Sequence, residues 1–200
     1  MNYLAHIYLA QQSDDAMLGA LLGDFVKPHS GFQFTPEMEA EILTHRKIDS
    51  YTDSHPVVLQ AKQLFAGPSR RYAGILLDVF YDHLLARNWS AYSEIPLDEF
   101  IRGFYRALGA RAAVLPSNLA RAAPRMIEQD WLGSYIEYSG VELAINRISM
   151  RLSRNGDLLR HGLVDLESNY DVLAVGFQAF FPDLIRFAAS RRHAQSRSPV

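Results

Sequence analysis

The chain has 200 residues, 48% of them hydrophobic, which is enough for one domain with a real core but too few for two comfortable ones. Its formal net charge is -2, so it lacks the basic field that drives binding to nucleic acid or anionic membranes. There is no cysteine, which excludes disulfides, thiolate metal sites and cysteine nucleophiles. Any metal must therefore be held by His, Asp or Glu.

The first segment, MNYLAHIYLA, is apolar, but no basic region precedes it and it has no small-residue cleavage site. No window approaches the apolar length that a membrane span needs. We therefore expect a cytoplasmic protein with neither a membrane nor a nucleic acid as partner.

Helical periodicity continues along the chain, whereas the β-branched alternation typical of strands is nearly absent. Thr35 is a strong expected N-cap, because Pro36 and two acidic residues follow it. A separate helix should begin after Pro56, since the residue before a proline resists the helical conformation. The expected helices cover residues 2–10, 14–25, 35–54, 56–65, 67–89, 96–115, 117–131, 140–152 and 161–190.

These elements predict an all-α fold. Residues 1–190 should form a single compact multi-helix domain, because no linker divides them. Residues 191–200 lack apolar anchors and are expected to be disordered.

Ionisable residues recur four positions apart on helices that are otherwise apolar. His45 and Asp49 share one helix face, and Asp78 and Asp82 share another, with His83 adjacent. A buried carboxylate costs several kcal/mol unless it is paired, hydrogen-bonded or bound to a metal. For a single aspartate such as Asp78, a buried hydrogen-bond network is the simpler explanation.

The pattern favours a metal site once other segments are included. Asp24 again follows an apolar stretch, and histidines recur at His6, His45 and His83. Several helices that each deliver a carboxylate or imidazole are typical of hard-metal sites in helical proteins, and the donor types favour Mn²⁺, Mg²⁺ or Fe²⁺. Arg46 and Lys27 could contact phosphate, although solvated surface cations explain them equally well.

Five motifs occur in order: MNYLAHIYLA, LLGDFVK, HRKIDSYTDSHP, LDVFYDHLLARNW and FFPDL. Together they resemble the acyl carrier protein phosphodiesterase family, over residues 1 to about 187. The resemblance implies hydrolysis of the phosphodiester that joins 4'-phosphopantetheine to a serine of holo acyl carrier protein. It also implies a divalent metal, typically Mn²⁺, and an HD-domain-like fold without the HD dipeptide.

The resemblance assigns site residues by motif position. Those in the family's GDF, HRxID and LDVxxDH motifs are expected to bind metal or take part in catalysis. Asn2 and His6, from the opening motif, are expected to support the ligands from outside. The expected metal ligands are Asp24, His45, Asp49, Asp78 and Asp82, and the expected catalytic residues are Asp24, His45, Arg46, Asp49 and His83.

The implied mechanism is in-line attack on phosphorus by a water that the metal activates. His83 or His45 could protonate the leaving serine oxygen, but a histidine bound to the metal could not easily do both. Arg70, Arg71 and Arg87 are candidates for docking the acidic carrier protein. The alternatives are an HD-type nucleotide phosphohydrolase and a noncatalytic helical binding module.

Overall fold

The computed structural model describes residues 1–27 and 31–195, and this part of the chain contains ten α-helices and no strand. The prediction of a single all-α domain is confirmed, whereas the HD-domain-like arrangement stays a prediction. In chain order the helices are α1 (Tyr3–Leu9), α2 (Asp14–Leu22), α3 (Pro36–Ser54), α4 (Pro56–Lys62), α5 (Ala73–Arg87), α6 (Leu97–Ala110), α7 (Ser117–Glu128), α8 (Tyr138–Arg151), α9 (Gly156–Ser168) and α10 (Tyr170–Gln195).

The start of α3 follows from its own residues. The Thr35 hydroxyl accepts a hydrogen bond from the Met38 N–H at 3.3 Å, and Pro36 occupies the first turn. The helix ends where His55 adopts an extended backbone conformation before Pro56, and α4 begins there. Both boundaries agree with the sequence prediction.

Other boundaries differ from the expected ones. The segment expected as one helix over 67–89 begins with a 3-10 helix, η1 (Gly67–Tyr72), and only then continues as α5. The expected helix over 161–190 is two helices, because α9 starts earlier, at Gly156, and ends before Asn169.

The C-terminal part of α10 corrects the expected tail. Residues 191–195 are helical rather than disordered, while residues 196–200 lie outside the described part of the chain. The physical reason is a long-range ion pair, in which Arg192 Nε lies 2.6 Å from the Glu41 carboxylate of α3. The Glu41 side chain is only 4% exposed, so this pairing compensates a buried charge.

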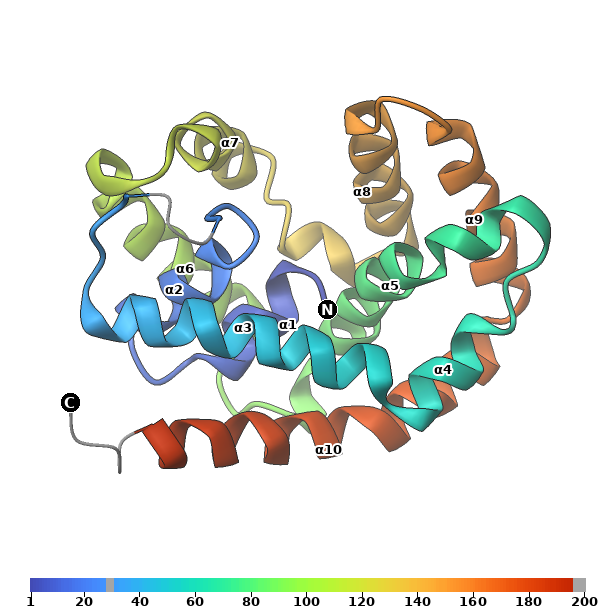
Figure 1. Ribbon diagram of the computed structural model, residues 1–200, viewed down its shortest axis with the longest axis horizontal. Coiled ribbons are helices and arrows are strands. Elements are labelled where there is room, and N and C mark those ends of the chain that lie inside the picture. The colour runs from blue at the N-terminus through green and yellow to red at the C-terminus, as the bar shows by residue number, and fades with distance from the viewer. Residues whose placement is uncertain (28–30, 196–200) are drawn as a thin grey trace.

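The helices that position the site are α1, α3 and α5. Helix α5 runs through the core, where the side chains of Leu76, Phe80 and Leu84 are buried. It packs against α1 and α8, and α2 packs closely on α3. Helix α10 runs along α3 and α4 on the opposite side from α7 and α8 (Figure 1). Met1 is buried and its amino group contacts Asp49 of α3 and Asp78 of α5, so the N-terminus lies between helices that are far apart in the sequence.

Helix α10 also contains a stretch, Tyr170–Arg192, that is long and apolar enough by length and composition to cross a membrane. The expectation that no window of the chain approaches the apolar length of a membrane span is therefore corrected. One third of the apolar 18-residue window within it is buried, and α10 packs against α3 and α4 among other elements. A single helix of this kind is weak evidence for a membrane span, because core helices of globular proteins pass the same test.

Candidate metal centre

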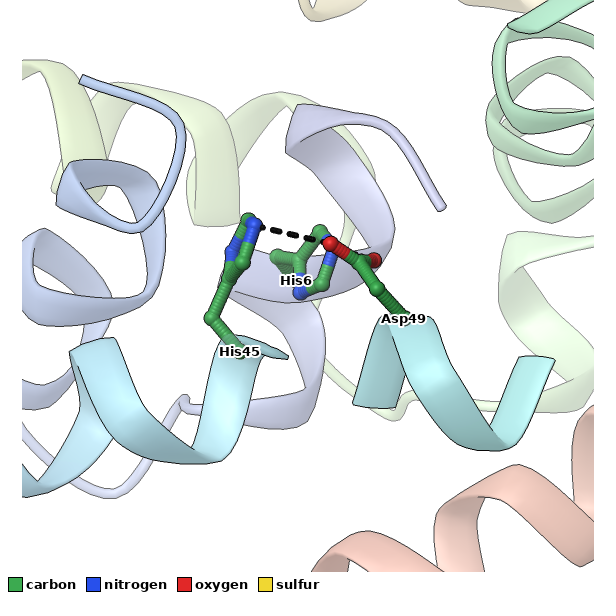
Figure 2. Close-up of side chains that lie close together, drawn as sticks. All are labelled: His6, His45 and Asp49. Atoms are coloured by element: carbon green, nitrogen blue, oxygen red, sulfur yellow. Dashed lines mark hydrogen bonds and ion pairs between the residues drawn. The ribbon is translucent and has the colours of Figure 1, made fainter. Parts of the chain in front are cut away.

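Three ligating side chains converge between α1 and α3. His45 and Asp49 lie one turn apart on α3, and His6 reaches them from α1 (Figure 2). One ligand atom from each residue lies within 4.8 Å of the other two. Within the described residues this is the group whose spacing suits a metal ion.

The His45 ring is oriented by the backbone of α2. Its Nδ1 lies 2.7 Å from the Ala20 carbonyl oxygen, so Nδ1 carries the proton and donates it to that acceptor. Its Nε2 then faces two carboxylates, at 3.2 Å from Asp49 Oδ2 and 3.6 Å from Asp24 Oδ1. A histidine fixed by a backbone carbonyl in this way is typical of metal ligands.

The His6 ring stacks on the His45 ring, with 3.7 Å between centroids and 17° between planes. Its Nε2 lies 3.0 Å from Asp49 Oδ1. Its Nδ1 is buried and has no hydrogen-bond partner among the residues that the structure describes. A buried nitrogen without a partner is costly, whereas the Nε2 of the same ring faces the Asp49 carboxylate.

The pKa values of the two histidines shift in opposite directions because only His45 contacts two carboxylates. Burial, together with the nearby His45 charge, lowers the pKa of His6 to about 4. Burial also opposes protonation of His45, but the hydrogen bonds to Asp24 and Asp49 outweigh it and raise the pKa of His45 to about 9. The site therefore attracts positive charge at the position that Asp24 and Asp49 share.

Asp49 is the carboxylate common to both histidines. Burial alone would raise its pKa, but the hydrogen bonds from His45 and His6 hold the pKa well below its usual range. The imidazoles are at most 3% exposed, whereas the side chains of Asp24, Asp49 and Asp78 are 37–40% exposed. The acidic side of the centre is therefore open to solvent.

Asp78 joins the centre through the α-amino group of Met1. That ammonium nitrogen lies 2.8 Å from Asp78 Oδ1 and 3.4 Å from Asp49 Oδ1. Burial would lower the pKa of the ammonium, but the two carboxylates raise it to about 11. The structure thus brings together Asp24, His45, Asp49 and Asp78 of the expected site.

Asp82, which was expected to be a metal ligand, has both carboxylate oxygens occupied by backbone donors. Its side chain is fully buried, and its oxygens accept hydrogen bonds from the Leu4 and Ala5 N–H groups at 2.8 and 3.1 Å. These are first-turn donors of α1, whose N-cap residue Asn2 makes no capping bond. Burial raises the pKa of Asp82 to about 7, against the effect of both N–H groups.

His83 is likewise occupied by the protein. Its Nδ1 lies 2.7 Å from the Tyr135 carbonyl oxygen, and its Nε2 lies 2.8 Å from the Tyr170 hydroxyl. The ring is buried, and burial lowers its pKa. The structure therefore leaves neither ring nitrogen of His83 directed at the centre formed by His6, His45 and Asp49.

The remaining predicted residues lie around the centre. Arg46 donates from Nη2 to the Val26 carbonyl oxygen at 3.1 Å, and Lys27 is exposed. Asn2 donates to the Tyr135 hydroxyl at 2.5 Å. Asp53 lies one turn beyond Asp49 but pairs with Lys62 at 2.7 Å.

His6 was expected to support the ligands from outside, and the structure places it in the same group as His45 and Asp49. The available signal was its isolation, because His6 is the only ionisable side chain among the apolar residues of MNYLAHIYLA apart from two tyrosines. Two imidazoles and a surrounding set of carboxylates suit a divalent transition metal such as Mn²⁺ or Fe²⁺. The residues present therefore fit the divalent metal that the sequence predicted.

Comparison with known proteins gives a consistent result. The model of the acyl carrier protein phosphodiesterase family matches residues 1–184. A protein of Enterobacter sp. (strain 638) named acyl carrier protein phosphodiesterase is 34% identical, over 96% of this chain and 100% of the relative. A relative of the same name from Escherichia coli (strain K12 / DH10B) is 35% identical, over 96% of this chain and 99% of its own length.

No solved structure matches the chain. The family model and the curated relatives both extend over nearly the whole sequence, including every residue of the centre. The chain therefore belongs to the acyl carrier protein phosphodiesterase family and is a phosphodiester hydrolase.

Proposed function

We propose that this protein removes 4'-phosphopantetheine from holo acyl carrier protein by hydrolysing the phosphodiester to the carrier serine, with the help of a divalent metal. The observation that carries the proposal is the convergence of His6, His45 and Asp49 within 4.8 Å, in a chain whose relatives bear the name of this activity. The metal proposed is Mn²⁺, with Mg²⁺ or Fe²⁺ as alternatives.

A divalent metal in this centre would polarise a phosphoryl oxygen and lower the pKa of a water molecule. The chain's own residues would hold it, with His45 as the best-oriented ligand because Ala20 fixes its Nδ1–H. His6 and Asp49 complete the inner group, and Asp24 and Asp78 add negative charge on its solvent side.

A group other than His83 must donate the proton to the leaving serine oxygen. Both nitrogens of the His83 ring are hydrogen-bonded, one to the Tyr135 carbonyl oxygen and the other to the Tyr170 hydroxyl. His45 is also unsuitable while it ligates the metal, since its other nitrogen is committed to Ala20. We therefore propose that these two histidines support the site without acting as the general acid. Arg46 lies beside the centre, and its bond to Val26 orients the backbone that follows Asp24.

Membership of a phosphodiesterase family disfavours the noncatalytic module, and no feature of the centre selects a nucleotide substrate. The test of the proposal is mass spectrometry of holo acyl carrier protein incubated with the enzyme and Mn²⁺. We expect the carrier to lose the mass of phosphopantetheine, and EDTA to abolish the loss. An unchanged carrier mass with Mn²⁺ supplied would overturn the proposed activity.

Two variants on α3 separate the centre from its surroundings. Asp49→Ala should lower turnover by more than about 100-fold. Mutating residues that only support metal ligands already lowers metal affinity or activity by about 10–100-fold. Asp53→Ala is the matched control, since Asp53 lies one turn further on and pairs with Lys62. Equal activity of the two variants would show that the centre is misassigned.

A further inference from the structure

A cleft of about 650 Å³ opens beside the metal centre, between α7 and α8. Figure 1 shows these two helices on the same side of α3, with the N-terminus of the chain below the space between them. The charged and tyrosine side chains that line the cleft are Asp24, Tyr3, Arg121, Arg125, Arg147 and Arg151.

The four arginines form two pairs at helical spacing, one pair on each wall. Arg121 and Arg125 are one turn apart on α7, and Arg147 and Arg151 are one turn apart on α8. Residues at this spacing share a helix face, so each helix presents two guanidinium groups to the cleft. This double pattern is readable in the sequence, but only the fold brings the two helices together.

The arginines of α8 are held in place by neutral groups. Arg147 lies over the Trp131 ring at 4.6 Å and donates to Gln129 Oε1 at 3.1 Å. Arg151 donates from Nε to the Arg147 carbonyl oxygen at 3.2 Å. These contacts orient the guanidinium groups without neutralising their charge.

None of the four arginines forms an ion pair with a carboxylate in the described parts of the chain. Some arginines elsewhere do pair, as Arg111 does with Asp15 and Arg192 with Glu41, whereas Arg70 and Arg71 have no carboxylate partner in the described parts of the chain either. A net charge of -2 means that carboxylates are plentiful. What distinguishes the cleft is that four unpaired guanidinium groups line one cavity, an arrangement that suits an anionic partner.

The position of the cleft connects it to catalysis. Asp24 lines the cleft, and Asp24 Oδ1 also lies 3.6 Å from His45 Nε2 in the metal centre. Tyr3 lines it as well and belongs to the same first turn of α1 that Asp82 holds. A molecule bound between α7 and α8 would thus extend directly to the metal centre.

We propose that this cleft docks an acidic segment of the protein substrate, with Arg121, Arg125, Arg147 and Arg151 pairing with its carboxylates. The proposal rests on the proposed function, because it takes the carrier protein as the substrate. A phosphodiester alone carries a single negative charge, whereas four guanidinium groups on two walls match several anionic groups spread over a surface. Arg70 and Arg71, the docking residues expected from the sequence, lie instead in η1, which packs against α9.

The test compares two double charge reversals in the full-length enzyme with Mn²⁺. Arg121→Glu with Arg125→Glu should raise the KM for holo carrier protein at least about tenfold and leave kcat less affected, because docking rather than chemistry is weakened. Added salt should weaken the wild-type reaction more than that of this variant. Arg70→Glu with Arg71→Glu makes the same charge change on exposed residues outside the cleft and should leave KM within about twofold of the wild-type value.

Circular dichroism checks that both variants fold, and both sites lie at exposed positions. A KM that rises only in the Arg70 and Arg71 variant, or in neither variant, overturns the docking proposal while the proposed activity stands. If the wild-type enzyme does not act on holo carrier protein, calorimetric titration with apo carrier protein still tests docking. Binding that is weakened at least tenfold by the cleft variant supports the cleft, and absent or unchanged binding overturns it.

Discussion

Asp82 is fully buried, and both of its carboxylate oxygens accept hydrogen bonds from the first turn of α1. Asp78, one turn earlier on α5, instead meets the Met1 ammonium beside Asp49. Two aspartates at helical spacing therefore have different contacts. One supports the backbone that carries His6, and the other adds charge to the metal centre.

Replacing Asp82 by alanine should destabilise the fold more than it weakens metal binding. The buried N–H groups of Leu4 and Ala5 would lose their acceptor, at a cost of about 1–3 kcal/mol for each group left unsatisfied. Urea unfolding followed by circular dichroism measures this loss. Asp82→Asn is the control, since its amide oxygen keeps one acceptor. If Asp82→Ala were as stable as the wild type but lost Mn²⁺ binding, Asp82 would be a metal ligand.

At the residue scale, the sequence predicted contacts within one helix better than contacts between helices. The pairing of His45 with Asp49 follows from their spacing, because four residues make about one turn. The same rule applied to Asp78 and Asp82 could not distinguish a ligand from a helix cap, because the answer depends on what α1 places opposite them. The position of His6 beside His45 and Asp49 could not be predicted for the same reason, because it is a contact between helices.

At the level of elements, the packing of α2 on α3 depends on a glycine, which has no Cβ atom. A Cβ atom at Gly23 would lie 2.2 Å from Cγ of the His45 ring, well inside contact distance. Gly23 has an ordinary right-handed helical conformation, so its smallness rather than its backbone freedom is what the site requires. The glycine in the GDF motif thus makes room for the His45 ring.

Gly23→Ala should displace the His45 ring and weaken Mn²⁺ binding about tenfold or more, as measured by isothermal titration calorimetry. Overpacking should also lower the free energy of unfolding by about 1–3 kcal/mol. Gly109→Ala, in α6, is the matched control because a Cβ atom there meets nothing within 4 Å. Identical Mn²⁺ affinity in both variants would argue against His45 as a ligand.

Element boundaries were predictable where local chemistry sets them. The start of α3 and the break at Pro56 depend on Thr35, Pro36 and Pro56, all visible in the sequence. The division between α9 and α10 at Asn169 has no proline or glycine to mark it. The extension of α10 to Gln195 accompanies the contact of Arg192 with Glu41, which is 151 positions away in the sequence.

For the molecule as a whole, His83 connects three segments of the fold. It belongs to α5, and its nitrogens bind the carbonyl of Tyr135 in the 3-10 helix η4 (Gly133–Ile136) and the hydroxyl of Tyr170 at the start of α10. Burial keeps its pKa below the ordinary value. Its protonation is therefore linked to global stability.

This linkage predicts that His83 makes the protein less stable in acid. The unfolded chain binds a proton on this histidine near pH 6.5, whereas the folded protein binds it only at lower pH. The contribution of neutral His83 is complete above about pH 6.5 and declines as pH falls below that value. Unfolding free energies measured between pH 7.5 and 5.5 should fall in the wild type and fall less in His83→Gln.

His161→Gln provides the comparison for this pH dependence, because His161 is exposed on α9. Its pH slope should match that of the wild type. A slope in His83→Gln that also equals the wild-type slope would contradict the idea that this buried ring contributes to the acid response.

The helical class of the whole molecule was predictable because periodicity is present in every segment. The convergence of segments around Asp24, His45 and Asp78 was expected as well, and the structure shows these residues near one another. The cleft between α7 and α8 was not predicted, since its two arginine pairs are about twenty residues apart and only tertiary packing unites them.

The arginine cleft also concentrates positive charge at one place on an acidic protein. With four positive charges gathered on one side of a molecule whose net charge is negative, the remaining surface is more acidic than the overall figure suggests. An acidic protein that approaches the cleft would be attracted more strongly than one that approaches a more acidic part of the surface. The field would thus orient an incoming acidic substrate before contact. A larger fraction of collisions would then bring the substrate to the cleft.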